Sequence, residues 1–335
     1  MTTGVATQRS DEDVLRECLE GVVADRFGRR AGGITAVERK RSKYSSFYAS
    51  DVITVRLASG GELRVFLKDF GSYHHPKDSM EARREREIAV YRDLLPGAGL
   101  DTADYYGSVS DPAGGRFWLL LEYVEGVPVR HLTFERWIAP AKWLGRMYGC
   151  FGRRPALWEG CPLLVRHDAT FFHSTADQAL RSATDYSAEL GQRLAPVVGR
   201  YDEAVAVMTA QPPTLVHGTF RPAQIITDDS TNPPRICPVD FEKAAVGASL
   251  YDLTFLVDGF DPPRLRRLFE AYREGAAQGG VRVPDDVEMN HVVDCFRLHR
   301  VMNWLAVSLA RRYTDDVICK LVGMAEQVGA AVSQG

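Results

Sequence analysis

Apolar and polar residues alternate in two neighbouring stretches of the N-terminal third of the chain. The alternating apolar positions are Ile53, Val55 and Leu57, followed by Leu63, Val65 and Leu67. A period of two residues is typical of a strand with one buried face. The segment Ser59-Gly60-Gly61 separates the two stretches, so the pattern predicts a β-hairpin. Further strands are predicted at 103–109 and 116–123, on either side of a turn rich in Gly and Pro.

Most of the remaining chain has apolar residues at helical spacing. The first helix is predicted over 11–27, with Ser10 or Asp11 as its N-cap. A second helix is predicted from about Ser79 to Leu95. The other predicted helices cover 134–149, 175–194, 262–278, 285–311 and 314–333.

Two charged residues interrupt this apolar pattern. Glu87 falls within the apolar stripe of the second predicted helix, and a carboxylate on a buried face requires a cationic partner or becomes neutral. Lys68 ends the second strand of the hairpin. It is either a solvent-facing lysine at a strand end or a lysine that binds phosphate groups.

Polar residues gather at the ends of two short apolar segments in the second half of the chain. Segment 215–216 leads into His217-Gly218, and segment 236–239 leads into Asp240. A Pro- and Asn-rich turn at 228–234 joins the two halves, which predicts that the two strand ends lie side by side as a hairpin. The polar residues that this hairpin would bring together are His217, Thr219, Gln224 and Asp240.

These residues resemble the catalytic segment of the aminoglycoside phosphotransferase and choline kinase-like family, a group related to the protein kinases. The family pattern is His-Gly-Asp, four residues, Asn, and then an apolar strand that ends in Asp before an aromatic residue. The chain has His217-Gly218 and Asp240-Phe241 at the matching positions. Thr219 stands where the family has its catalytic Asp, and Gln224 stands where it has an Asn metal ligand. Segment 246–253 resembles the family's continuation, Gly-Asp-Pro-Leu-Tyr-Asp-Leu.

The resemblance implies an α+β fold of the bilobal protein kinase-like type. Residues 1–122 would form a small nucleotide-binding lobe with an antiparallel sheet and a helix. Residues 123–335 would form a larger, mainly helical lobe that contains the catalytic segment 215–253. In related enzymes an insertion, here at about 151–205, helps to shape the acceptor pocket.

The resemblance also implies a nucleotide site for ATP or GTP. Lys68 would pair with Glu87, with Glu85 as the alternative acid, and would hold the α- and β-phosphates. The loop before the hairpin would cover the phosphates, and the backbone of the hinge between the lobes, at about 122–124, would bond the base. The residues implied for these contacts are Lys68, Glu87, Ser45, Ser46, Glu122, Tyr123 and Val124.

In the catalytic segment, Asp240 and Gln224 are the implied ligands of Mg²⁺, which prefers hard oxygen donors. Thr219 occupies the position of the family base, but a hydroxyl has no useful basicity near neutral pH. His217 either organises the loop backbone or acts as a replacement base. Asp252 is expected to be structural, bonding the loop backbone near His217.

Two functions follow from this pattern. The first is transfer of the γ-phosphate of ATP or GTP to a hydroxyl of a metabolite, natural product or antibiotic. The alternative is a catalytically degenerate kinase-like protein that binds a nucleotide or small ligand without phosphoryl transfer. Either reading makes a small molecule the expected partner.

Composition excludes several other classes. The formal net charge of −3 gives no electrostatic case for binding nucleic acid or an anionic membrane. The six cysteines lack CxxC spacing, which argues against a zinc site or a disulfide framework. No apolar run approaches the roughly 18 residues that span a bilayer, and residues 1–10 lack the apolar core of a signal peptide. We therefore expect a cytoplasmic monomer or homodimer.

Overall fold

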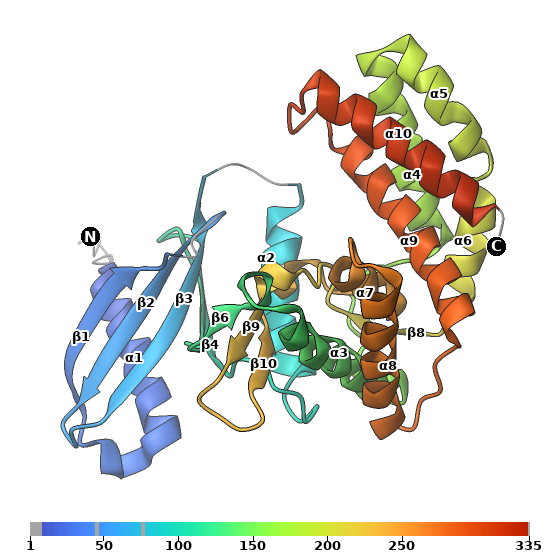
Figure 1. Cartoon of the computed structure of the whole chain (residues 1–335). Coiled ribbons are helices and arrows are strands. Elements are labelled where there is room, and N and C mark those ends of the chain that lie inside the picture. The colour runs from blue at the N-terminus through green and yellow to red at the C-terminus, as the bar shows by residue number, and fades with distance from the viewer. Residues whose placement is uncertain (1–8, 44–46, 75–77, 334–335) are drawn as a thin grey trace, which may run out of the picture. The chain divides into compact units, whose positions relative to one another are not determined.

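The computed structural model describes residues 9–43, 47–74 and 78–333. The chain divides into two compact units (Figure 1). The first unit comprises Met1–Pro96, Asp101–Gly126 and Asp228–Cys237, and the second comprises Gly97–Leu100, Val127–Thr227 and Pro238–Gly335.

The first unit contains a five-stranded antiparallel sheet with the strand order β1-β2-β3-β5-β4. Its strands are β1 (Ile34–Arg41), β2 (Tyr48–Leu57), β3 (Glu62–Tyr73), β4 (Tyr105–Asp111) and β5 (Arg116–Glu122). Strands β2 and β3 form the predicted hairpin, with Val55 opposite Leu63 and Ile53 opposite Val65. The alternating residues of both strands are buried, as their period of two predicts.

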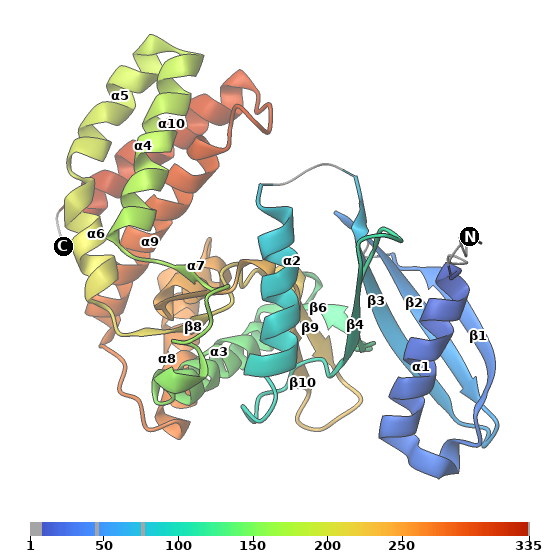
Figure 2. The same ribbon diagram turned by 180° about the vertical axis from the view of Figure 1, so that it is seen from behind.

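Helix α1 (Asp11–Phe27) packs across one face of this sheet (Figure 2). The apolar side of the helix, including Leu19 and Val22, joins one hydrophobic cluster with the inward-facing residues of β2 and β3. Ser10 caps the helix by accepting a hydrogen bond from the Asp13 N–H at 3.1 Å. The predicted N-terminal helix and its cap are therefore confirmed.

Helix α2 (Met80–Ala89) continues as a π-helical turn, Val90–Leu94. The Leu95 N–H donates to the Val90 carbonyl, the five-residue spacing that defines this turn. The helix predicted from about Ser79 to Leu95 is confirmed in extent. Its buried side carries Glu87 together with apolar residues.

The second unit is mainly helical. Its helices are α3 (Ile138–Gly152), α4 (Ala169–Tyr186), α5 (Ala188–Gly199), α6 (Tyr201–Ala210), α7 (Leu250–Val257), α8 (Pro262–Gln278), α9 (Asp286–Ala306) and α10 (Asp315–Val332). Helices α4, α5, α6, α9 and α10 form a bundle (Figure 1). Helix α3 packs against α8.

One predicted helix was wrong. The segment 175–194 is not continuous, because α4 ends at Tyr186 and α5 begins at Ala188. Ser187 between them is extended, with φ −157° and ψ 129°. Its N–H closes α4 on the Ala183 carbonyl, and its carbonyl accepts the Gly191 N–H of α5. Serine is a favoured residue at a helix start, and the break lets α5 turn back onto α4.

Short strands position the loop that follows residue 216. Strand β8 (Pro213–Val216) pairs antiparallel with β11 (Ala245–Ala248), which also pairs with β7 (Val165–Arg166). The other short strands are β6 (Val127–Pro128), β9 (Ile225–Asp228) and β10 (Arg235–Pro238), of which β6 pairs with β9.

The strand that leads into His217 therefore pairs with β11, and the predicted pairing of 215–216 with 236–239 was wrong. Strand β11 is the better neighbour because it is buried throughout and continues directly into α7. Within the described ranges, each helix is too short or too polar to cross a bilayer.

Candidate functional site

Lys68 and Glu87 form a buried ion pair within the first unit. Lys68 Nζ lies 2.7 Å from Glu87 Oε2, and the two side chains are 10% and 2% exposed. The alternative acid, Glu85, instead accepts a bond from Arg84 Nε at 2.9 Å. The predicted pairing is confirmed. The reading of Lys68 as a solvent-facing lysine at a strand end was wrong, because Lys68 is buried and β3 continues to Tyr73.

The segment after β5 offers fewer backbone donors than the sequence suggests. The Glu122 N–H donates to the Asp104 carbonyl at 2.8 Å, and the Tyr123 N–H donates to the Arg64 carbonyl at 3.2 Å. Both N–H groups are thus occupied within the first unit, so the predicted base contact depends on the Val124 N–H as donor. The implied phosphate contacts Ser45 and Ser46 lie outside the described residues.

In the second unit, Asp252 holds the backbone of the catalytic segment. Its carboxylate accepts the His217 N–H at 2.6 Å and the Gly218 N–H at 2.9 Å. Asp252 is fully buried near the start of α7. Burial raises the pKa of Asp252 to about 7, although the backbone hydrogen bonds oppose this rise. The predicted structural role of Asp252 is confirmed.

Gly218 is required by the close approach of another backbone segment. It has φ +82°, and a Cβ at this position would lie 2.0 Å from the Lys243 carbonyl oxygen. A side chain is excluded by sterics as well as by the left-handed backbone. The His-Gly pair therefore reflects the packing of loop 217–224 against the segment after Asp240.

The His217 ring is fully buried and bonds backbone with both nitrogens. Nε2 lies 3.0 Å from the Val239 carbonyl oxygen, so Nε2 carries the proton and donates it. Nδ1 accepts the Thr219 N–H at 3.3 Å. This geometry favours the role of His217 as an organiser of the loop over that of a replacement base.

Thr219 is a buried neutral residue at the position of the family base. Its side-chain oxygen is inaccessible to solvent and has no hydrogen-bond partner among the residues that the structure describes. A threonine hydroxyl supplies no basicity at this position.

Gln224 and Asp240 meet in the same loop system. Gln224 Nε2 donates to Asp240 Oδ2 at 2.6 Å. Gln224 Oε1 is buried and has no partner within the described part of the chain. Asp240 adopts a left-handed conformation, φ 73° and ψ 59°, which is uncommon for a residue other than glycine and is often found at functional sites. A carboxylate and an unused amide oxygen are donors suited to Mg²⁺, so the residues fit this ion.

The predicted acceptor segment, 151–205, contains the end of α3, β7, helices α4 and α5 and the start of α6. Asp168 caps α4 by accepting the Phe171 N–H at 2.9 Å. Sequence analysis missed a cluster beside the loop in which the guanidinium groups of Arg221 and Arg300 lie over the ring of Phe255. The available signal was the position of Arg221, two residues after Thr219.

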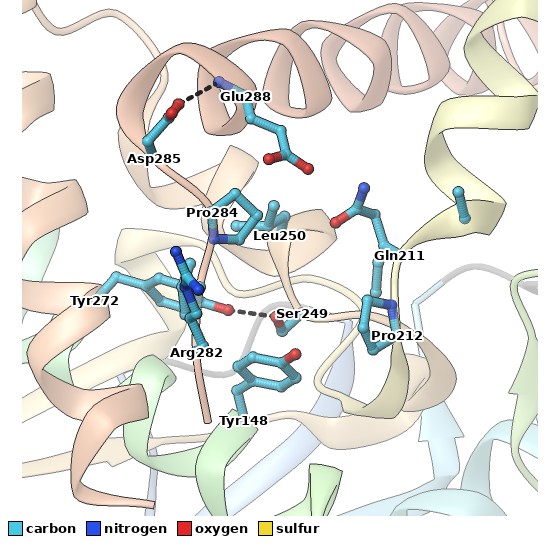
Figure 3. Close-up of a pocket in the computed structure, with 13 residues that line it drawn as sticks. Tyr148, Gln211, Pro212, Ser249, Leu250, Tyr272, Arg282, Pro284, Asp285 and Glu288 are labelled. Atoms are coloured by element: carbon cyan, nitrogen blue, oxygen red, sulfur yellow. Dashed lines mark hydrogen bonds between the residues drawn. The ribbon is translucent and has the colours of Figure 1, made fainter. Parts of the chain in front are cut away.

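A separate cavity of about 430 Å³ opens in the second unit (Figure 3). Its lining includes buried Tyr148, Ser249 and Tyr272 and exposed Arg282 and Glu288. It lies where Pro213 pairs with Ala248, at the opposite end of β8 and β11 from the loop. Three residues of strand, roughly 10 Å, separate the two ends. The predicted site residues do not line this cavity, which is distinct from the loop.

Comparisons with known proteins agree with this geometry. Residues 46–286 match the model of the phosphotransferase enzyme family. No curated protein sequence matches the chain. The fold is similar to that of a mutant aminoglycoside 2′-phosphotransferase-IIIa in complex with GDP, with a TM-score of 0.62 and 15% identity over 94% of this chain and 98% of that chain.

Two further structures share the fold. A microcompartment-associated aminopropanol kinase has a TM-score of 0.57 and 17% identity, with 97% of each chain covered. Choline kinase from Cryptosporidium parvum Iowa II has a TM-score of 0.58 and 11% identity, with 97% of this chain and 96% of that chain covered. These similarities confirm the α+β, protein kinase-like fold. Since the family model covers most of its length, the chain belongs to the phosphotransferase enzyme family.

Proposed function

We propose that the protein is a small-molecule phosphotransferase that moves the γ-phosphate of ATP or GTP to a hydroxyl group. The observation that carries this proposal is the family match over residues 46–286, which includes both the Lys68–Glu87 ion pair and the Gln224–Asp240 contact. Phosphoryl transfer needs position and charge more than covalent chemistry, and these two pairs supply charged groups of the required kinds.

Lys68 binds the α- and β-phosphates in this proposal, and Glu87 holds the lysine side chain in place. A lysine on this strand, paired with a glutamate from the following helix, has that role in protein kinases. The Lys68 side chain is only 10% exposed, and its ammonium is fixed by a 2.7 Å bond to Glu87. It therefore loses little conformational freedom when it takes up a phosphate oxygen.

Asp240 and Gln224 would hold Mg²⁺ through a carboxylate and an amide oxygen. Mg²⁺ held by these residues would supply positive charge to offset the negative charge of the phosphate oxygens. Asp240 is held for this task by its left-handed backbone, and the Val239 N–H bonds the Gln224 carbonyl at 2.8 Å. The two ligands thus come from segments that are tied to each other directly.

The expected reaction rate is low because Thr219 occupies the position of the family base. General base catalysis contributes about 10²- to 10⁴-fold, and a threonine hydroxyl provides none of it. In a loose, metaphosphate-like transition state the acceptor proton leaves late, so transfer proceeds without a strong base. We expect a slow enzyme whose rate depends chiefly on positioning.

Nucleotide binding is the first test. One structural relative was solved with GDP, so GTP is tested beside ATP. Mg·ATP or Mg·GTP should raise the melting temperature of the wild-type protein, and Lys68→Ala and Asp240→Ala should each abolish the shift. Lys320→Ala and Asp177→Ala, which remove exposed residues of the same types, should retain it. A shift that persists in both site variants would contradict the assigned nucleotide site.

Transfer is the second test. The protein and the nucleotide are incubated with each member of a panel of hydroxyl compounds. Mass spectrometry should then detect a phosphorylated product. Nucleotide binding without any product, in the wild type and in Thr219→Asp alike, would instead support a nucleotide-binding protein that transfers no phosphate.

A further inference from the structure

Arg221 presents an unbalanced positive charge beside the catalytic loop. Its N–H donates to the Thr219 carbonyl at 2.6 Å, which fixes its backbone next to the position of the family base. Its side chain is exposed, and its guanidinium lies 5.7 Å from the centre of the Phe255 ring. Throughout the described ranges, no carboxylate bonds this guanidinium.

A second arginine lies against the same ring. Arg300 on α9 is 7% exposed, and its guanidinium lies 5.6 Å from the Phe255 ring centre and 5.1 Å from that of Trp304. Nη1 donates to the Thr254 carbonyl at 3.1 Å, and Nη2 bonds Asp258 at 2.6 Å. Phe255 therefore has one paired, buried guanidinium and one unpaired, exposed guanidinium in contact with it.

The nearby acids are already engaged by other arginines. Arg297 Nη1 bonds Asp294 at 2.7 Å, and its Nε lies 3.7 Å from Asp258. Asp258 also holds Arg300. Three arginines thus face two aspartates, which leaves the charge of Arg221 in excess. Burial lowers the pKa of Arg300, and the charges of Arg297 and Arg221 add to this effect, as expected of a cluster short of anions.

We infer that Arg221 and Phe255 form an anion-binding subsite for the acceptor, and that the acceptor is a hydroxylated small molecule bearing a carboxylate or phosphate group. The inference rests on the proposed function. An acceptor hydroxyl must come within about 3–3.5 Å of the transferred phosphorus, so the rest of the molecule lies beside loop 217–224. Arg221 is the exposed charged residue of that loop.

The geometry suits an oxyanion that presents two acceptor oxygens. A guanidinium presents a rigid fork of N–H donors that matches carboxylate and phosphate oxygens. Stacking on Phe255 restricts the Arg221 side chain while leaving its edge available for these bonds. Phe255 and Trp304 are both partly exposed and offer an apolar surface to the hydrocarbon part of the acceptor.

The same charge disfavours cationic acceptors. A polyamine such as kanamycin, which is bound in the structure of one relative, would bring ammonium groups toward an unpaired guanidinium. Like charges at close range repel unless a carboxylate lies between them. The acidic residues of this cluster, Asp258 and Asp294, already pair with arginines.

Matched probes test the inference directly. We would measure binding to the holoprotein with Mg²⁺ and a non-hydrolysable ATP or GTP analogue by ligand-observed NMR titration. The anionic probes are para-(hydroxymethyl)benzoate and para-(hydroxymethyl)phenylphosphonate. The neutral and cationic probes are para-(hydroxymethyl)benzamide and para-(aminomethyl)benzyl alcohol, and kanamycin is the polycation. Both anions should bind about 10-fold or more tightly than the amide, and the amines most weakly.

Two arginine variants separate this site from general charge effects. Arg221→Gln should remove the preference for the anionic probes, and Arg221→Lys should restore it only in part, because an ammonium lacks the fork. Arg267→Gln is the control, since Arg267 is also exposed and stacked, 4.9 Å from the Phe134 ring centre. Equal losses in Arg221→Gln and Arg267→Gln would overturn the inference.

Other outcomes also decide it. Equal binding of the benzoate and the benzamide by the wild type, or tighter binding of the amines, would overturn the inference even if nucleotide binds as proposed. So would an Arg221→Gln variant that loses only nucleotide affinity, because Arg221 would then serve the nucleotide phosphates. Anion binding that depends on Arg221 while nucleotide fails to bind would uphold the subsite and contradict the proposed function.

Discussion

The ion pair of the first unit and the catalytic segment of the second unit differ in how they hold charge. In the first, Lys68 and Glu87 bond each other directly and are almost completely buried. In the second, the carboxyl group of Asp252 holds backbone N–H groups, while the position of the family base carries the neutral Thr219. The ion pair retains the side chains of the family pattern, whereas the loop retains mainly its backbone.

A family motif usually combines two requirements, the shape of the loop and the chemistry of the reaction. In this chain the two requirements fall on different residues. His217, Gly218 and Asp252 shape the loop, and each has a partner that explains its residue type. Thr219 and Gln224 would act on substrate and metal, and each has a buried oxygen without a partner among the described residues. A fold is maintained by the first kind of residue, and activity depends on the second kind.

Restoring the missing base gives the largest expected change. Thr219→Asp should raise turnover by about 10²- to 10⁴-fold if the loop is otherwise competent, because a carboxylate accepts the acceptor proton. The measurement is the initial rate of nucleotide-dependent transfer, or of nucleotide hydrolysis while no acceptor is known. Thr219→Asn is the control, since it has a similar shape and no basicity. Equal rates in both variants would mean that the loop lacks more than a base.

Removing the Asp252 carboxyl group, which anchors the loop, should cause the largest loss of stability. Asp252→Ala leaves the N–H groups of His217 and Gly218 without their acceptor, at a cost of about 1–3 kcal/mol each, or about 4 kcal/mol in total. The free energy of unfolding from urea titration measures this loss. Asp252→Asn keeps one acceptor oxygen and should lose about half as much. Two variants of wild-type stability would show that the bonds contribute little.

Breaking the ion pair of the first unit should cost slightly less. Lys68→Met removes the cation bonded to a buried carboxylate, which typically destabilises by about 3 kcal/mol. The double variant Lys68→Met/Glu87→Leu should recover most of that stability, because it removes both buried charges. Neither variant should bind nucleotide in the thermal-shift assay. A double variant no more stable than the single one would contradict this account of the pair.

The smallest predicted effect, counted per pH unit, concerns His299, a buried histidine that belongs to neither region. Burial lowers the pKa of His299 to about 3, with a further contribution from His167, and Nδ1 lies 3.0 Å from the Tyr201 hydroxyl. Between about pH 6.5 and pH 3 the unfolded chain therefore binds more protons than the folded one, so stability falls as the pH falls through this window.

His299→Leu should flatten the acid side of the stability profile by about 1.4 kcal/mol per pH unit. Urea titrations at several pH values measure the slope. His131→Gln, at an exposed position, is the control and should leave the slope unchanged. An unchanged slope in His299→Leu would show that this group does not control acid unfolding.

The sequence by itself determined the elements whose signals are local. Periodicity placed α1 and the β2–β3 hairpin, because each pattern of buried residues repeats within one element. The isolated acid in the stripe of α2 indicated a buried partner, and the family pattern identified Lys68. Asp252 was assigned a structural role from the family's continuation.

Only the tertiary structure decided which distant segments meet. Strand β8 pairs with β11 and not with the segment before Asp240. The sequence could not predict this pairing, because a short apolar strand contains no feature that identifies its neighbour. No proline or glycine marks the helix break at Ser187, which arises from the packing of α5 on α4. Arg221, Phe255 and Arg300 come from three separate elements, so their cluster and its excess charge exist only once the chain is folded.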